Sequence, residues 1–256
     1  MPDFVNSLSR GLMILKAFSR TRPMLRLQEL TTITDLPKTT VLRLLRTLIT
    51  LNFVQYSASS KQYFLGPETL SLGFTVLTNM ELRKTALPYI EALSSQSNQN
   101  TAIGILVGTD MVCIERIKKI RLLTIDLYVG ARLNLYRSAM GMAFLAFLGR
   151  EEYKRILAKI LSEKGEDDFI GQNGENLAGI LETVRQKGYA LSDNELIPGV
   201  IGIGAPIFNY NGEVEAAISM PVVRGVVGKE ELIERYVPML IDTAKKISLA
   251  RGHGAK

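Results

Sequence analysis

Cysteine and histidine are nearly absent from this chain of 256 residues, which contains one of each and no tryptophan. The single cysteine, Cys113, excludes an intramolecular disulfide framework and fits a reducing compartment. It lies in the strand-like segment DMVCIERI, where it is either a packed small hydrophobe or a thiol nucleophile. The single histidine, His253, belongs to the segment RGHGAK, where we expect disorder and no part in a catalytic triad or metal site.

Long apolar runs are also missing. No run reaches the roughly 18 residues that a membrane-spanning helix needs, and the segment MPDFVNSLSR lacks the basic and apolar regions of a signal peptide. Hydrophobic residues make up 46% of the chain and charged residues 22%, which favours a folded core over disorder. We therefore expect a folded cytoplasmic protein without a membrane partner, with about one small and one medium domain.

Motifs of catalysis are scarce. The GxSxG pattern and clustered metal ligands are absent, and the glycines of GVIGIGAP are not followed by the strand, loop and helix of a dinucleotide site. Asp193 and Glu195 could act as acid and base, but carboxylates this close in sequence are common. The sequence therefore predicts no catalytic residue, no metal and no cofactor, and an enzyme remains an alternative.

Positive charge is concentrated in the first third of the chain. Residues 1–80 contain nine Lys and Arg against four Asp and Glu, whereas the remainder contains 22 against 21. A basic segment attached to a nearly neutral one suggests a polyanion-binding module beside a module with another task. A solvated basic surface is the alternative.

Residues 36–50, LPKTTVLRLLRTLIT, predict a helix with two different faces. At about 100° per residue, one face carries the apolar side chains Val41, Leu44, Leu45 and Leu48. Thr39, Arg43 and Arg46 fall on the opposite side. Hydroxyls near a helix start can reach phosphates, and arginine can read guanine in the major groove. The predicted DNA contacts are Lys38, Thr39, Thr40, Arg43, Arg46, Thr47 and Lys61.

The neighbouring segments predict the rest of a small domain. NSLSRGLMILKAFS and RLQELTTIT have helical spacing, and Asn6 or Ser7 can cap the first helix. In FVQYSASSKQYFLG, residues 53–56 and 62–65 read as strands of a hairpin, with Lys61 near its tip. Helix, turn, helix and hairpin form the winged helix-turn-helix arrangement. A small helical domain with an exposed basic face is the alternative.

The remaining two-thirds mix helices and strands. Helices are expected near residues 67–79 and 81–96, the second interrupted or bent by Pro88. TAIGILV, MVCIERI and LLTIDLYV resemble strands, and GVIGIGAPIFNYNGEVEAAISMPV resembles a hairpin with its turn at residues 209–212. Further helices are expected in SAMGMAFLAFLG, in EEYKRILAKIL, in the segment that ends at Gly188 and over residues 229–250, with a polar loop at residues 165–174. This pattern favours an α+β domain.

Six segments, taken in order, resemble the IclR family of transcriptional regulators. They are NSLSRGLMILKAFS, LQELTTITDLPKTTVLRLLRTL, QYFLGPETLSLG, GARLNLYRSAMGMAFLA, VRQKGYALSDNELIPGVIGIGAPIF and GEVEAAISMP. The resemblance implies an α+β fold with a winged helix-turn-helix DNA-binding domain at residues 5–66 and a linker helix at 67–79. A GAF-like effector-binding domain with a curved antiparallel sheet would follow at residues 80–252.

The resemblance also implies where a small molecule would bind. Carried over by position, the effector-binding residues are Ala139, Met140, Ser192, Gly202, Ser219 and Pro221. Of these, the hydroxyl of Ser219 is the most credible contact for a ligand carboxylate, although ordinary packing is the alternative for each position.

This chain departs from the family pattern at several places. Many relatives carry glycine, an acid and threonine where residues 98–100 read NQN, and several carry an acid at Ser192 and cysteine at Gly202. Leu135, Met140 and Met142 make the neighbourhood apolar, so we expect a partly hydrophobic organic acid, either aromatic or aliphatic, as the effector. Arg132 or Arg137 either neutralises its carboxylate or is a surface charge.

Together these features predict a sequence-specific transcriptional regulator. One winged module covers too little DNA for high specificity, so a homodimer or homotetramer on a palindromic double-stranded operator is expected. The effector would act by preferring one arrangement of the domains and so changing operator affinity. A module that binds nucleic acid without sequence preference is the remaining alternative.

Overall fold

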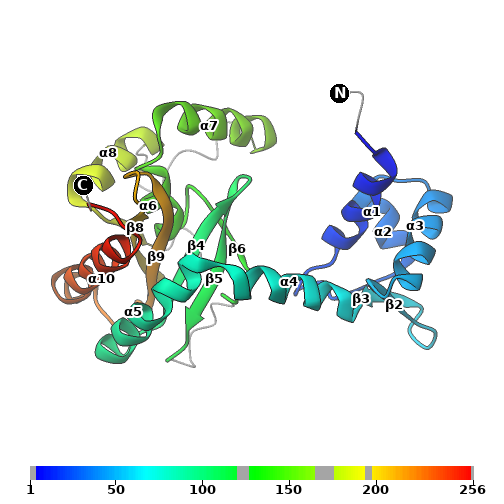
Figure 1. Cartoon of the computed structure of the whole chain (residues 1–256), viewed down its shortest axis with the longest axis horizontal. Helices are drawn as coiled ribbons and strands as arrows, with labels where there is room; N and C mark the ends of the chain where they lie inside the picture. The colour runs from blue at the N-terminus through cyan, green and yellow to red at the C-terminus, as the bar shows by residue number, and fades with distance from the viewer. Residues whose placement is uncertain (1–3, 120–126, 165–175, 194–197, 255–256) are drawn as a thin grey trace. The chain divides into compact units, whose positions relative to one another are not determined.

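The structure is a computed structural model that describes residues 4–119, 127–164, 176–193 and 198–254. It divides into two compact units, Met1–Asn79 and Met80–Lys256 (Figure 1). Most of the strand expected at residues 122–129 and the polar loop expected at 165–174 lie outside the described residues. Across the described ranges, no helix combines the length and apolar character needed to cross a membrane.

The first unit is a winged helix-turn-helix. Its elements are α1 (Asn6–Ala17), β1 (Met24–Leu25), α2 (Leu27–Thr34), α3 (Lys38–Thr50), β2 (Val54–Ser57), β3 (Gln62–Leu65) and α4 (Pro67–Asn79). The three strands form an antiparallel sheet in the order β1-β3-β2, in which Met24 pairs with Phe64. Strand β1 is too short for a sequence pattern to reveal it, because two residues show no alternation.

Apolar side chains from α1, α2 and α3 and from the strands β1 and β2 form the core of this unit. The side chains that are at most 1% exposed are Ile14, Leu25, Leu30, Val41, Leu45 and Val54. The turn before α3 depends on Asp35, whose left-handed φ of 51° ends α2, and on Pro37 at the N-cap of α3. The prediction that Asn6 or Ser7 caps α1 was wrong, because the helix begins at Asn6 and Val5 occupies the cap without a side-chain bond.

Helix α4 closes the unit and contributes no buried side chain anywhere along its described length. Its apolar residues Leu70, Leu72, Phe74 and Val76 are between 59% and 74% exposed. A helix that is apolar on all sides is normally covered by other structure. The sequence of α4 is therefore that of a buried helix.

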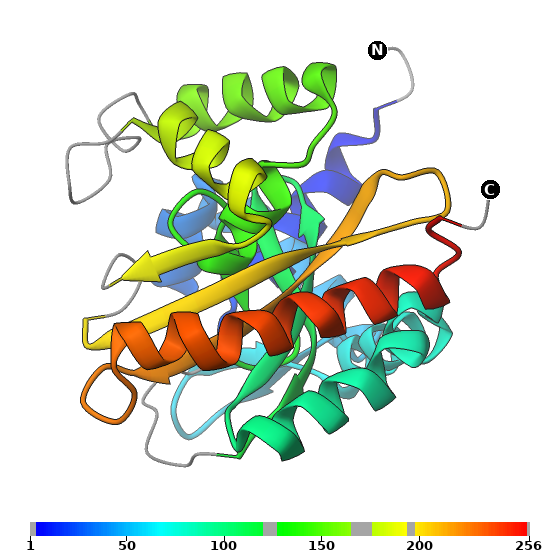
Figure 2. The same cartoon turned by 90° about the vertical axis from the view of Figure 1, so that its left-hand side faces the viewer.

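The second unit is built on one curved antiparallel sheet of six strands in the order β6-β5-β4-β9-β8-β7. The strands are β4 (Thr101–Val107), β5 (Asp110–Ile117), β6 (Arg132–Asn134), β7 (Ala190–Asp193), β8 (Val200–Phe208) and β9 (Val214–Val223). Helices α5 (Glu81–Ser97) and α10 (Val237–Ala250) lie side by side on one face (Figure 2). Helix α6 (Ala139–Leu145) packs on the other face, where α7 (Arg150–Lys164) and α8 (Leu177–Lys187) also lie. The sheet thus separates two apolar cores.

Two helices of this unit contain a proline, and the sequence pattern assigned a structural effect only to Pro88, which was expected to interrupt or bend its helix. Pro88 does not interrupt α5, which is continuous from Glu81 to Ser97. The single closing helix expected at residues 229–250 consists of α9 (Lys229–Glu231), a π-helical turn (Leu232–Tyr236) and α10. The wide turn precedes Pro238, which has no N–H to donate to the carbonyl four residues earlier, and a change of helical register accommodates that missing bond.

A β-bulge in β5 interrupts the alternation predicted for DMVCIERI. Ile103 pairs with Glu115 whereas Gly104 pairs with Cys113, so Ile114 is an extra residue. Bulges re-aim the side chains that follow them. Cys113 accordingly packs in the core on the α6 side, while Glu115 reaches Arg83 of α5, with 2.6 Å between Oε2 and Nη2.

Candidate functional sites

The outer surface of α3 carries the side chains predicted to contact DNA. Lys38, Thr39, Arg43, Arg46 and Thr47 are exposed, and Thr40 is half-buried. On the opposite side, the side chains of Val41 and Leu45 are buried, while those of Leu44 and Leu48 are only partly covered. Helix α3 therefore presents a row of hydroxyls and cations on one side while its other side packs on α1 and α2.

The hairpin of β2 and β3 lies next to this row. Lys61 is exposed at the hairpin turn, with a left-handed φ of 55°. The rings of Tyr56 and Tyr63 are 4.8 Å apart, and burial raises the pKa of Tyr63, an effect that Tyr56 strengthens and the charge of Arg46 opposes. Arg46 is thus close enough to act on the wing. Sequence reasoning missed Tyr56, whose exposed ring faces Tyr63 across the hairpin.

A groove of about 730 Å³ runs along α1 and α3 within the first unit. Its apolar lining comes from Leu8, Leu12, Leu15, Leu44, Leu48, Leu51, Phe53 and Leu72. Thr40, Arg43 and Thr47 also line it, so Arg43 lies at a border between an apolar surface and the polar row of α3. Leu8 and Leu12 are among the exposed large hydrophobic residues of the chain.

The six positions predicted for effector binding come together in the second unit. They line one cavity of about 50 Å³ on the α6 side of the sheet, together with Leu127, Leu133, Ser138 and Val200. Helix α6 supplies Ala139 and Met140, and strands β7, β8 and β9 supply the remaining four predicted positions. Sequence reasoning did not single out the four additional residues, because their meeting depends on how α6 sits on the sheet.

Glycines allow α6 to lie directly on β8. A Cβ atom on Gly204 would be 2.2 Å from the carbonyl oxygen of Ala139. Two residues earlier on the same strand, a Cβ on Gly202 would be 3.5 Å from the Cβ of Ala139, an ordinary contact distance. Gly204 is therefore required for the close approach of helix and strand, whereas Gly202 borders the space that remains as the cavity.

Three serine hydroxyls face this cavity, and two of them already have partners. Ser138 Oγ donates to Asn134 O at 2.7 Å and accepts from Gly141 N at 3.0 Å, which caps α6. Ser192 Oγ donates to Arg137 O at 2.8 Å. Within the described residues, the hydroxyl of Ser219 forms no hydrogen bond. It is therefore the cavity hydroxyl best placed to bind a ligand.

Neither arginine considered as a partner for a ligand carboxylate lines the cavity. Arg132 instead binds Asp110, with 3.1 Å between Nη1 and Oδ2. Leu135 and Met142 are fully buried beside the cavity, so its surroundings are apolar as expected. A volume of about 50 Å³ is well below the roughly 150 Å³ of a cavity known to hold benzene. An aromatic ring would fit only after the cavity widens.

One wall of the cavity is connected to α5 through β5. The guanidinium of Arg116 donates to the carbonyl of Leu127, and the backbone N–H of Arg116 donates to Glu115 Oε1 at 2.9 Å. The other carboxylate oxygen of Glu115 binds Arg83, whose Nε is buried without a hydrogen-bond partner. These contacts join a cavity residue to the helix that follows α4 in the chain.

The residues weighed for catalysis have structural partners. Burial raises the pKa of Cys113 to about 12, so its thiol stays protonated and is not an activated nucleophile. Asp193 binds Arg224 at 2.5 Å, and Glu195 lies outside the described residues. The expectation that the segment around His253 is disordered was wrong, because the imidazole stacks on Phe208 with 5.2 Å between ring centres. In the described ranges, no cluster of three or more His, Cys, Asp or Glu residues could hold a metal ion.

Comparisons with known proteins identify the same two units. The family model of the IclR helix-turn-helix domain matches residues 7–58, and that of the bacterial transcriptional regulator IclR C-terminal domain matches residues 74–249. The Pca regulon regulatory protein of Pseudomonas putida is 31% identical over 96% of this chain and 84% of its own. The transcriptional repressor IclR of Escherichia coli is 27% identical over 97% of this chain and 90% of its own.

Solved structures share the fold over nearly the whole chain. An IclR family transcriptional regulator from Brucella abortus has a TM-score of 0.83 and 28% identity, covering 97% of this chain and 94% of its own. An IclR homolog from Microbacterium hydrocarbonoxydans, solved in complex with 4-hydroxybenzoate, has a TM-score of 0.76 and 20% identity, covering 96% and 99%. At that identity the second likeness shows the fold alone.

Proposed function

The chain belongs to the IclR family of bacterial transcriptional regulators, and from that premise we propose a specific mode of action for it. It is a DNA-binding transcriptional regulator; in our proposal it recognises a palindromic operator as a homodimer or a dimer of dimers. A small organic acid in the cavity of the second unit sets its operator affinity. The observation that most supports operator recognition is the exposed row of hydroxyls and cations on α3 beside the wing.

The roles of the residues in this row follow from their chemistry. Arg43 and Arg46 can each present two donors to the acceptors of a guanine in the major groove. Lys38, Thr39, Thr40 and Thr47 lie nearer the DNA backbone in this proposal and bind phosphates. Lys61 binds a phosphate from the wing, and its contact contributes affinity without sequence preference.

Two substitutions separate base reading from phosphate binding. For each half-site, Arg43→Ala should reduce the preference for an operator, selected from a random library, over a scrambled duplex by roughly 5- to 150-fold, which corresponds to about 1–3 kcal/mol. Lys61→Ala should weaken binding to both duplexes equally and lower the slope of log affinity against log salt by about 0.9 for each bound subunit. Fluorescence anisotropy at several salt concentrations measures both effects. Equal affinity of the unaltered protein for operator and scrambled DNA would contradict specific recognition.

The uncovered apolar residues of the first unit support assembly with a second copy. Leu70, Leu72, Phe74 and Val76 of α4 are exposed, as are Leu8 and Leu12 of α1. Exposed apolar surface of this kind marks an interaction site. A homodimer that covers it would also place two copies of α3 on a two-fold symmetric operator, with half-sites one or two helical turns apart.

A partly apolar carboxylic acid fits the cavity chemistry best. Ser219 offers a hydroxyl without a partner among the described residues, and most of the other lining residues are apolar. The complex of the Microbacterium hydrocarbonoxydans homolog supports 4-hydroxybenzoate as a first candidate. Because a ring requires a wider cavity than about 50 Å³, such a ligand prefers a conformation in which the walls have moved. A ligand that prefers one conformation is what linkage to operator affinity requires.

Thermal-shift measurements test the effector proposal. The panel consists of small carboxylic acids and includes 4-hydroxybenzoate. The effector should stabilise the folded chain by RT ln(1 + [L]/Kd), so the melting temperature should rise with its concentration. Ser219→Ala should weaken the binding of that acid by roughly 10- to 150-fold, since a hydrogen bond to a charged group contributes about 1.5–3 kcal/mol. Ser162→Ala, an exposed position on α7, is the matched control. If no acid in a broad panel shifts the transition, the effector proposal fails while DNA recognition stands.

A further inference from the structure

A second and larger recess lies at the β7 side of the sheet. Strand β7 pairs only with residues 201–204 of β8, so residues 205–208 have no strand neighbour on that side. A groove of about 620 Å³ occupies this position, between the end of α8 and helix α10. It shares no lining residue with the small cavity beside Ser219.

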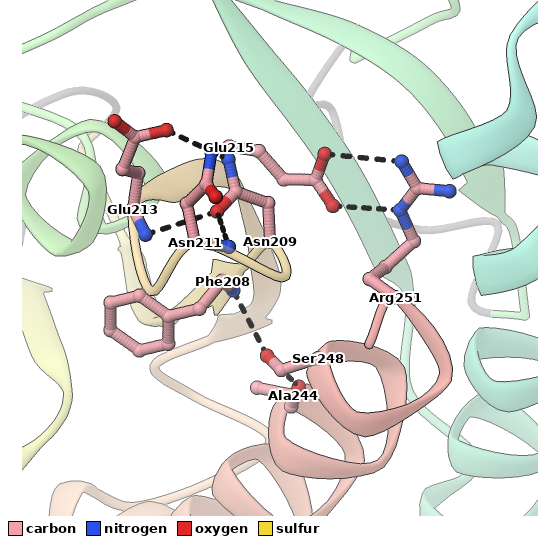
Figure 3. A network of polar contacts seen from close by, with 8 residues as sticks. All are labelled: Phe208, Asn209, Asn211, Glu213, Glu215, Ala244, Ser248 and Arg251. Carbon is pink, nitrogen blue, oxygen red and sulfur yellow. Dashed lines mark hydrogen bonds and ion pairs between the residues drawn. The ribbon is translucent and has the colours of Figure 1, made fainter. Parts of the chain in front are cut away.

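The edge of β8 along this groove cannot readily accept another strand. Pro206 has no N–H to donate. The N–H of Phe208, two residues on and therefore on the same side of the strand, donates to Ser248 Oγ at 3.0 Å (Figure 3). Ser248 Oγ in turn donates to Ala244 O at 2.8 Å. A ligand that binds by side-chain contacts suits the groove better than an extended peptide.

Aromatic rings form one wall of the groove. Phe147 meets Phe208 edge-on at 5.4 Å, and the imidazole of His253 stacks on Phe208 at an interplanar angle of 25°. His253 reaches this position because Gly252, the residue before it, adopts a left-handed φ of 84°. Two contacts fix the turn, since His253 N donates to Ser248 O at 2.9 Å and Arg251 Nε lies 2.8 Å from Glu215 Oε1 (Figure 3).

Cations border the same groove. Arg185, Lys187 and Lys245 line it, and no carboxylate is among its described lining residues. Arg185 is held in place by Ala146 O at 2.6 Å and Glu182 at 3.2 Å. Within the described part of the chain, Lys187 and Lys245 form no ion pair. The groove therefore carries uncompensated positive charge that favours an anion.

We propose that this groove is a second ligand site, which binds a planar aromatic carboxylate. The ring of the ligand lies against Phe208 and His253, and its carboxylate meets Lys245 and Lys187. The volume falls within the roughly 300–1,000 Å³ of known small-molecule sites. The site goes beyond the proposed effector cavity, because a fused aromatic ring fits this groove and exceeds a cavity of about 50 Å³.

Calorimetric titration of the full chain with 2-naphthoate tests the proposal. The expected result is saturable binding that is weaker for 2-naphthalenemethanol, which lacks the charge, and for cyclohexanecarboxylate, which lacks the aromatic ring. Lys245→Ala and His253→Ala should each lower the affinity for 2-naphthoate by roughly fivefold. Lys246→Ala is the matched control, because Lys246 neighbours Lys245 on α10 but pairs with Asp242 at 2.7 Å and does not line the groove.

Ser219→Ala separates this site from the effector cavity. Unchanged 2-naphthoate affinity in Ser219→Ala, together with weakening in Lys245→Ala, supports the groove even if no acid proves to be an effector. No saturable binding up to 10 mM, equal affinity in Lys245→Ala and Lys246→Ala, or loss of binding in Ser219→Ala each overturns the proposal. Thermal melting of each variant verifies that an exposed substitution has left the fold intact.

Discussion

Replacing Gly204 by alanine should destabilise the second unit, because α6 lies against this strand. The new Cβ would be 2.2 Å from Ala139 O, 2.5 Å from Ala139 C and 2.9 Å from Met140 N. All three are backbone atoms, so the helix itself must shift, and such overpacking costs about 1–3 kcal/mol. This cost is partly offset, because alanine in a strand is about 0.5–1 kcal/mol more stabilising than glycine. The net loss is therefore up to about 2.5 kcal/mol, or up to roughly 10 °C in melting temperature for a unit of this size.

Gly202→Ala is the matched control and should have the opposite sign. Its Cβ would be 3.5 Å from the nearest heavy atom, so it would not clash. Because alanine is more stabilising than glycine in a strand, the free energy of unfolding should rise by up to about 1 kcal/mol. Calorimetry with far-ultraviolet circular dichroism measures both variants, since the chain has no tryptophan to report unfolding. Equal melting temperatures for the two variants would refute the argument that α6 is held against β8 at Gly204.

Three further outcomes follow from contacts described above. Glu115→Gln weakens the contacts that connect the cavity to α5, so it should change the affinity for the effector acid by no more than about twofold. The factor by which this acid changes operator affinity should fall by fivefold or more, as measured by fluorescence anisotropy with and without the acid. Phe74→Glu should lower the assembly state in sedimentation velocity, whereas Thr75→Glu on the same helix should not. Since burial raises the pKa of Cys113 to about 12, the folded chain keeps a proton that the unfolded chain releases near pH 9. From pH 9 towards 12, the unfolding free energy should therefore fall by about 1.4 kcal/mol per pH unit relative to Cys113→Ala, measured by urea titration.

The local elements of the fold could be predicted from sequence because each depends on a short repeat. The two faces of α3 follow from a period of 3.6 residues, and the exposed side chains of Arg43 and Arg46 agree with it. The cavity positions had no such signal. Ala139, Ser192 and Ser219 lie far apart in the chain, and only the family resemblance placed them in one pocket.

Features that depend on register or long-range packing could not be predicted. The bulge at Ile114 is visible only when β4 and β5 are paired, and it sends Glu115 to the opposite side from the one that strict alternation predicts. The position of His253 depends on the left-handed backbone at Gly252 and on the ring of Phe208 in β8, which lies far away in sequence.

The lack of buried side chains on α4 has a consequence for how the chain matures. A helix of 13 residues standing alone in water is marginal, since nucleation is unfavourable and few bonds repay it. Each unit has its own apolar core, whereas α4 has no buried side chain among its described residues. In the proposed homodimer, the second copy would cover α4 and make it rigid, so the proposed coupling between effector and operator would exist only in assembled chains.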